Sequence, residues 1–137
     1  IERAARRDAL RVVHHMRDAL LRGEVVGVFP EGTTSDGQTL LPFHANLIQA
    51  AVAAQAPVQP VALEFVDARS GRISLAPIYI GDQTLVGSVW RTLTTPGIRA
   101  VVTYGARQPP DGRERREWAA ALQARVADLR QHTVAPE

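Results

Sequence analysis

Short apolar runs alternate along this chain with segments of helical periodicity, and this alternation restricts the possible folds more than any other feature. Apolar residues spaced by three and four predict a helix over Ala4–Arg22, and Gly23 suits its C-terminal cap. Val25–Phe29 is almost wholly apolar, as is typical of a strand buried on both faces of a sheet. Pro30 ends that run.

The remainder of the chain continues the alternation. In order, the pattern predicts a helix over Ala45–Ala54, strands over Val58–Phe65 and Ile73–Tyr79, a helix marked by Leu85–Leu93, a strand over Ile98–Tyr104 and a helix marked by Trp118–Leu129. Ser70 and Gly71 favour a hairpin connection over Asp67–Arg72. The predicted fold class is therefore α/β, with one mixed β-sheet flanked by helices. Trp90 and Trp118 fall in apolar stripes and are expected in the core.

Composition excludes several kinds of chemistry. The chain contains no cysteine, so disulfide scaffolds, thiolate catalysis and cysteine–metal sites are excluded. It contains no lysine, which excludes Schiff-base chemistry and a P-loop lysine. A formal net charge of +2 gives no indication of a nucleic-acid partner. No apolar run approaches the ~18–20 residues that a membrane-spanning helix needs.

The segment Glu31–Gln38 carries the most informative cluster of polar residues. Gly32 allows close approach of the backbone to a ligand, and Thr33, Thr34 and Ser35 offer hydroxyls and backbone amides that suit an anion. The Glu31 carboxylate would repel an anion unless it held an arginine or a substrate hydroxyl. On local chemistry alone, an ordinary glycine-rich connection between a strand and a helix explains the segment equally well.

Several motifs resemble those of one family. Phe29–Thr33 is similar to the F-P-E-G-T block of the glycerolipid acyltransferases, which include the 1-acylglycerol-3-phosphate (lysophosphatidic acid) acyltransferases. Ile1–Arg3 resembles the end of the family's preceding F-I-x-R block, and Val58–Val61 resembles its following V-x-P-V block. Leu41–Phe43 is also typical of bacterial members. The three blocks occur in the family's order.

The resemblance implies a function. It implies transfer of a fatty acyl group from coenzyme A or acyl carrier protein to a lysophospholipid hydroxyl, with 1-acylglycerol-3-phosphate as the first acceptor to consider. Neither a metal nor a bound cofactor is implied, because the acyl thioester is a cosubstrate. Residues 1–131 would form an N-terminally truncated acyltransferase domain and 132–137 a tail. The implied location is the cytoplasmic face of the inner membrane, either peripheral or anchored by a segment outside this chain.

The family's functional residues map onto this chain individually. The resemblance assigns head-group binding to Arg3, Glu31, Gly32 and Thr33, and Thr34 and Ser35 extend that loop. It assigns Val58 and Pro60 to the acyl or acceptor pocket. The family's catalytic H-x-x-x-x-D block is absent, so its histidine and aspartate are expected upstream of Ile1. His14 and Asp18 are one residue too close, and we interpret that pair as a coincidence.

Several alternatives remain open. Thr34 stands where many members have arginine, which leaves room for a different acceptor such as a lyso-aminolipid. A non-catalytic module that binds lipid head groups is the competing hypothesis, and ester hydrolysis would need a water-activating group that the sequence does not reveal. For His44, packing or capping is favoured over a role as a base. The basic face Arg3, Arg7 and Arg11 suits either an anionic lipid surface or solvent.

Overall fold

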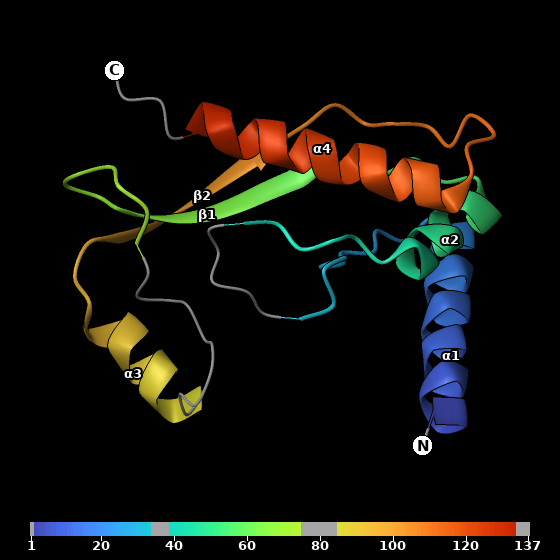
Figure 1. The fold of residues 1–137 in the computed structure, drawn as a ribbon, viewed down its shortest axis with the longest axis horizontal. Helices are drawn as coiled ribbons and strands as arrows, with labels where there is room; N and C mark the ends of the chain where they lie inside the picture. The colour runs from blue at the N-terminus through green and yellow to red at the C-terminus, as the bar shows by residue number, and fades with distance from the viewer. Residues whose placement is uncertain (1, 34–38, 75–84, 134–137) are drawn as a thin grey trace.

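The computed structural model describes residues 2–33, 39–74 and 85–133, with side chains described within 10–33, 39–74 and 86–131 (Figure 1). Its elements are α1 (Glu2–Leu21), α2 (Ala45–Ala54), β1 (Val61–Asp67), α3 (Leu85–Thr94), β2 (Ile98–Tyr104) and α4 (Arg115–Thr133). The combination of helices and a sheet confirms an α/β fold. The helix predicted over 45–54 is confirmed to the residue, and α4 includes His132, which was expected in the tail.

The sheet is a two-stranded antiparallel pair in the described part of the chain, whereas a mixed sheet was expected. Val61 pairs with Tyr104 at one end, and Asp67 pairs with Ile98 at the other. Helix α4 runs across one face of the pair (Figure 1). The opposite face carries exposed apolar side chains from both strands, including Leu63 and Val102.

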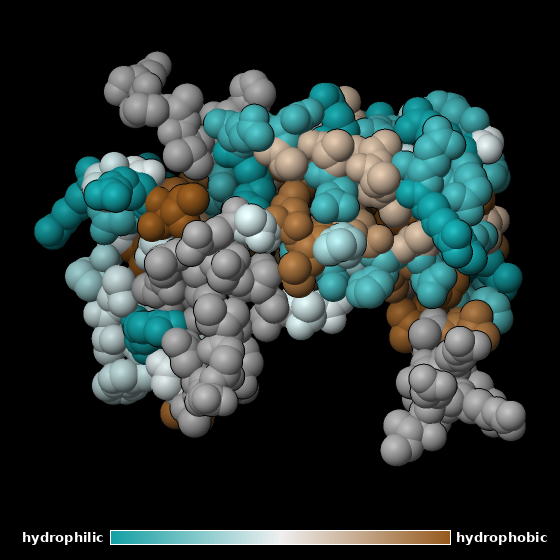
Figure 2. All heavy atoms as spheres, in the orientation of Figure 1, coloured by the Kyte–Doolittle hydropathy of each residue, from teal (hydrophilic) through white to brown (hydrophobic). Residues whose placement is uncertain are grey.

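The core lies where α2 meets α4. Its buried side chains are Ile48, Ala51, Trp118, Ala119 and Leu122, and partly buried Leu20, Phe43 and Val58 pack around them. The Trp118 side chain is fully buried, as predicted, and its indole N–H donates to Gln108 Oε1 at 3.3 Å. Much of the surface over α4 is hydrophilic, while hydrophobic side chains reach the surface below it (Figure 2).

A buried ion pair connects α4 to the sheet. Arg130 Nε donates to Glu64 Oε1 at 3.4 Å, and both side chains are largely buried. The second carboxylate oxygen of Glu64 has no hydrogen-bond partner. Because a buried unpaired charge is costly, Glu64 depends on Arg130 for compensation.

The strand predicted over Val25–Phe29 is wrong. These residues have no regular secondary structure, and Val25 is 98% exposed. A strand exists only when a neighbour satisfies its backbone N–H and C=O groups, and no described segment pairs with this one. The apolar composition therefore identified a segment that could join a sheet, but it could not show whether a partner strand lies beside it.

The predicted hairpin after β1 is confirmed. The Asp67 N–H donates to Arg72 O at 2.8 Å, and the chain returns so that Ile73 bridges to Val66. The Ser74 N–H then donates to Phe65 O at 2.8 Å. The rest of the strand predicted over Ile73–Tyr79 lies outside the described residues.

Helix α3 confirms the element that was predicted between Leu85 and Leu93, but not its environment. The Trp90 side chain is 69% exposed, so its expected place in the core is wrong. The periodicity correctly identified an apolar face and could not show what, if anything, packs on it. Within the described ranges, no helix combines the length and the apolar character that crossing a membrane requires.

Candidate functional site

The F-P-E-G-T segment forms a tight turn that leads from the apolar segment 25–29 toward α2. The Gly32 N–H donates to Phe29 O at 3.1 Å and closes the turn. Gly32 has a φ of +67°, in the left-handed region that a residue with a Cβ rarely adopts. This conformation explains why glycine occupies the fourth position of the block.

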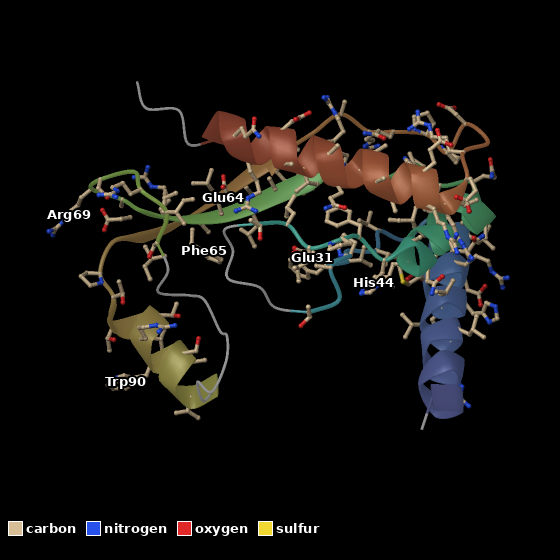
Figure 3. All side chains as sticks on the ribbon, in the orientation of Figure 1. Glu31, His44, Glu64, Phe65, Arg69 and Trp90 are labelled. Atoms are coloured by element: carbon tan, nitrogen blue, oxygen red, sulfur yellow. The ribbon has the colours of Figure 1, made fainter. Side chains whose placement is uncertain are left out.

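Glu31 holds the two ends of the loop together. Its Oε2 accepts a hydrogen bond of 2.7 Å from the Leu41 N–H, and the side chain is partly buried (Figure 3). Nearby, the His44 N–H donates to Pro30 O at 2.8 Å. From the sequence, Glu31 was expected to hold an arginine or a substrate hydroxyl. Its partner in the structure is instead a backbone N–H group.

His44 lies against the turn, in agreement with the packing role that the sequence favoured. A Cβ built on Gly32 would lie 2.7 Å from Cδ2 and 2.9 Å from Nε2 of the His44 ring. His44 occupies the N-cap position of α2, but its side chain makes no capping hydrogen bond. It therefore packs on the turn, and its exposed imidazole lies beside Gly32.

The other predicted head-group residues are only partly placed. Thr33 follows Gly32 and is exposed. Thr34 and Ser35 lie outside the described residues. The backbone of Arg3 belongs to the first turn of α1, and its side chain is not described. That turn lies at the end of α1 remote from α2, so the structure does not bring Arg3 next to Glu31 (Figure 1).

The two residues assigned to a pocket are held by packing contacts. Val58 bridges to Gln108 through two backbone hydrogen bonds of 2.9 and 2.8 Å and packs on the core. Pro60 is buried, and its Cγ lies 2.9 Å from where a Cβ on Gly105 would stand. These contacts explain both residues structurally, and their role in a pocket stays a prediction.

The pair His14 and Asp18 does not form a catalytic dyad. The Asp18 carboxylate accepts hydrogen bonds from Arg17 Nε at 3.0 Å and Nη2 at 2.7 Å. This side-chain hydrogen bonding lowers the pKa of Asp18. His14 and His15 are exposed. No group of three or more histidines and carboxylates in the described part of the chain is arranged to hold a metal ion.

Comparison with known proteins connects the turn to a family. Residues 1–64, which contain the turn, match the family model described as Acyltransferase. A 1-acyl-sn-glycerol-3-phosphate acyltransferase of Neisseria gonorrhoeae is 39% identical over 76% of this chain and 40% of its own length. A lyso-ornithine lipid O-acyltransferase of Pseudomonas aeruginosa is 33% identical over 94% of this chain and 49% of its own length.

A 1-acyl-sn-glycerol-3-phosphate acyltransferase alpha of Homo sapiens is 38% identical over 46% of this chain and 23% of its own length. The chain thus spans less than half the length of the curated relatives that it matches. No solved structure matches it.

Proposed function

The chain belongs to the acyltransferase family, and we propose that the complete protein transfers a fatty acyl group from an acyl thioester to the free hydroxyl of a lysolipid. The donor would be acyl-coenzyme A or acyl carrier protein. The reaction would take place at the cytoplasmic face of the inner membrane, where both a soluble thioester and a lipid acceptor are accessible.

The proposed reaction is an acyl substitution. The acceptor oxygen attacks the thioester carbonyl, an ester C–O bond forms and the C–S bond breaks to release a thiol. A base takes the hydroxyl proton, and the proton is then returned to the leaving sulfur. We assign this base to a histidine oriented by an aspartate upstream of Ile1, since no H-x-x-x-x-D block occurs in the chain.

The observation that carries the proposal is the geometry of the turn. The bond from Leu41 to Glu31 holds the loop at its base, and the left-handed Gly32 leaves Thr33 exposed. A turn fixed in this way presents the exposed Thr33 to a ligand without further ordering, which lowers the entropic cost of binding. We therefore place the acceptor head group at Gly32 and Thr33.

Two acceptors compete for this turn. The first is 1-acylglycerol-3-phosphate, whose phosphate suits the Thr33 hydroxyl and the predicted contribution of Arg3. The second is lyso-ornithine lipid, the acceptor named for the relative that aligns over 94% of the chain. Thr34 favours the second acceptor, because threonine lacks the bidentate guanidinium that many phosphate-binding members carry at this position.

The complete protein should be assayed with a panel of lysolipids against both acyl-coenzyme A and acyl carrier protein donors. We expect ester formation with 1-acylglycerol-3-phosphate or lyso-ornithine lipid, and the ratio of their kcat/KM values identifies the acceptor. Binding of these lipids without release of thiol would contradict the proposal and would favour the non-catalytic module that binds head groups.

The role of Arg3 makes a separate prediction. Arg3→Ala in the complete protein should raise the KM for the acceptor roughly tenfold or more and leave that for the donor unchanged, because a charged hydrogen bond contributes about 1.5–3 kcal/mol. Arg22→Ala is the matched control, since Arg22 forms an exposed pair with Glu24 at the other end of α1. Equal effects on acceptor and donor would reject the role.

A further inference from the structure

Helix α3 exposes a continuous apolar face. Val86 is 78% exposed, Val89 50%, Trp90 69% and Leu93 76%, and their spacing places all four on one side of the helix. Figure 3 shows the Trp90 side chain pointing away from the sheet and from α4. Ser88, at a different position around the helix, is buried. The apolar face of α3 (Val86, Val89, Trp90 and Leu93) therefore points outward.

No described element covers this face. The packing among the elements that the structure describes joins the two strands, α1 with α2, α2 with α4, and α4 with the sheet. Helix α3 stands apart from that packing (Figure 1). Burial of these four side chains would remove a large apolar area from water, so their exposure calls for an occupant.

The charge around α3 points to the chemistry of that occupant. Residues 85–99 contain no aspartate or glutamate but contain Arg91 and Arg99. Arg91 follows Trp90 in the last turn of α3, and the exposed Arg99 lies at the start of β2, just after the helix. Asp67 pairs with Ile98 just beyond α3, and its carboxylate accepts hydrogen bonds from the Arg69 and Ser70 N–H groups. A tryptophan on an apolar helical face with arginines beside it suits the interface of an anionic bilayer.

We propose that the apolar face of α3 inserts into the head-group region of an anionic lipid bilayer. The choice of a lipid surface over a protein surface rests on the proposed function, because an enzyme that acts on a lysolipid must reach lipid at a membrane. Docking through α3 would hold the protein where its acceptor is dissolved. A second copy of the chain and another segment of the protein are the competing occupants.

The test compares two exposed aromatic residues in the complete protein. Trp90→Glu should weaken binding to vesicles of phosphatidylcholine and phosphatidylglycerol by roughly tenfold or more. The reason is that the variant loses the favourable free energy of moving a large apolar side chain from water into the bilayer. Tyr104→Glu is the matched control, because Tyr104 is 67% exposed on β2, away from α3. It should leave vesicle binding unchanged, and both variants should keep the melting temperature of the original protein.

A fluorescent label on α3 tests whether this helix itself contacts lipid, even if other parts of the protein also bind the membrane. The 137 residues contain no cysteine, so Leu93→Cys can carry one environment-sensitive fluorophore once any cysteine outside them is replaced by serine. The emission should shift to the blue when anionic vesicles are added, whereas the same label on Leu21→Cys, an exposed site on α1, should not respond.

The outcomes separate the possible occupants. Unchanged vesicle binding by Trp90→Glu together with an unresponsive label at position 93 would overturn the proposal. A lowered melting temperature would assign the face to a covering protein segment, and loss of a dimer in sedimentation would assign it to a second copy. Vesicle binding through α3 by a protein that acylates no lysolipid would reject the proposed function and keep the docking surface.

Discussion

The contact between Gly32 and His44 makes the turn sensitive to a single methyl group. Gly32 adopts a left-handed conformation, and the His44 ring occupies the space that a Cβ would need. Two independent constraints, one from the backbone and one from a neighbour, thus favour glycine at this residue. Gly32 is also where we place the acceptor head group, so substitutions here should change acceptor binding as well as stability.

Gly32→Ala should lower both stability and acceptor affinity in the complete protein. The left-handed conformation costs an L-residue roughly 1–2 kcal/mol, and displacement of the His44 ring adds to that cost. A misplaced head group should lower kcat/KM for the acceptor by up to about a hundredfold. Urea unfolding measures the first effect, and steady-state kinetics with varied acceptor measures the second.

Gly23→Ala is the matched control for this substitution. Gly23 has a φ of +81°, but nothing lies within 4 Å of its added Cβ. It should show the loss of stability from the strained backbone and no change in acceptor kinetics. If both variants kept the original KM for the acceptor, the turn would not be part of the acceptor site.

Among the elements, the helices and the hairpin were predictable because their signals are local. Periodicity located α2 and α4, and Ser70 and Gly71 located the hairpin. The strand over 25–29 was not predictable in the same way, since a strand depends on a partner that local composition does not specify. The apolar stripe of α3 likewise located a helix without its environment, and so misplaced Trp90.

The hairpin at the end of β1 should depend on pH through Asp67. Its Oδ1 accepts hydrogen bonds from the Ser70 N–H at 2.7 Å, the Ser70 hydroxyl at 3.0 Å and the Arg69 N–H at 3.0 Å. The bonds from Ser70, followed by that from Arg69, lower the pKa of Asp67 from its ordinary value of 3.8. A lowered pKa in the folded state gives stability that is present above 3.8 and lost as the pH falls through the lowered pKa.

Asp67→Asn should therefore be less stable than the original protein at neutral pH, and the difference should shrink once the pH falls below 3.8. Urea unfolding of the complete protein across this range measures the difference. Asp111→Asn is the control, because Asp111 only approaches Arg113 at 3.6 Å in an exposed pair, and such pairs contribute little. A difference for Asp67→Asn that stayed constant with pH would show that its carboxylate is not what stabilises the hairpin.

At the scale of the whole molecule, the candidate site was only partly predictable. The F-P-E-G-T block identified Glu31, Gly32 and Thr33 because the block is a contiguous motif. The bond from Leu41 to Glu31 and the contact of His44 with Gly32 join residues that are distant in sequence. Such contacts depend on how the chain returns from the loop into α2, which no local pattern specifies.

The 137-residue chain should not transfer acyl groups by itself. We assign the base that takes the acceptor proton to residues upstream of Ile1, and we propose that the turn holds the acceptor. The complete protein should release thiol from an acyl thioester in the presence of a lysolipid, and the isolated chain at equal concentration should not. Transfer by the isolated chain would place a base within it, with His44 the first residue to replace.

The hydrogen bond from Leu41 to Glu31 closes the loop at its base. It joins residues ten positions apart, and the bond from the His44 N–H to Pro30 O joins the same turn to the start of α2. The residues between these ends can therefore be varied while the hydrogen bond that closes the loop is kept. A library confined to positions 34–38 would be a compact route to enzymes with new head-group preferences.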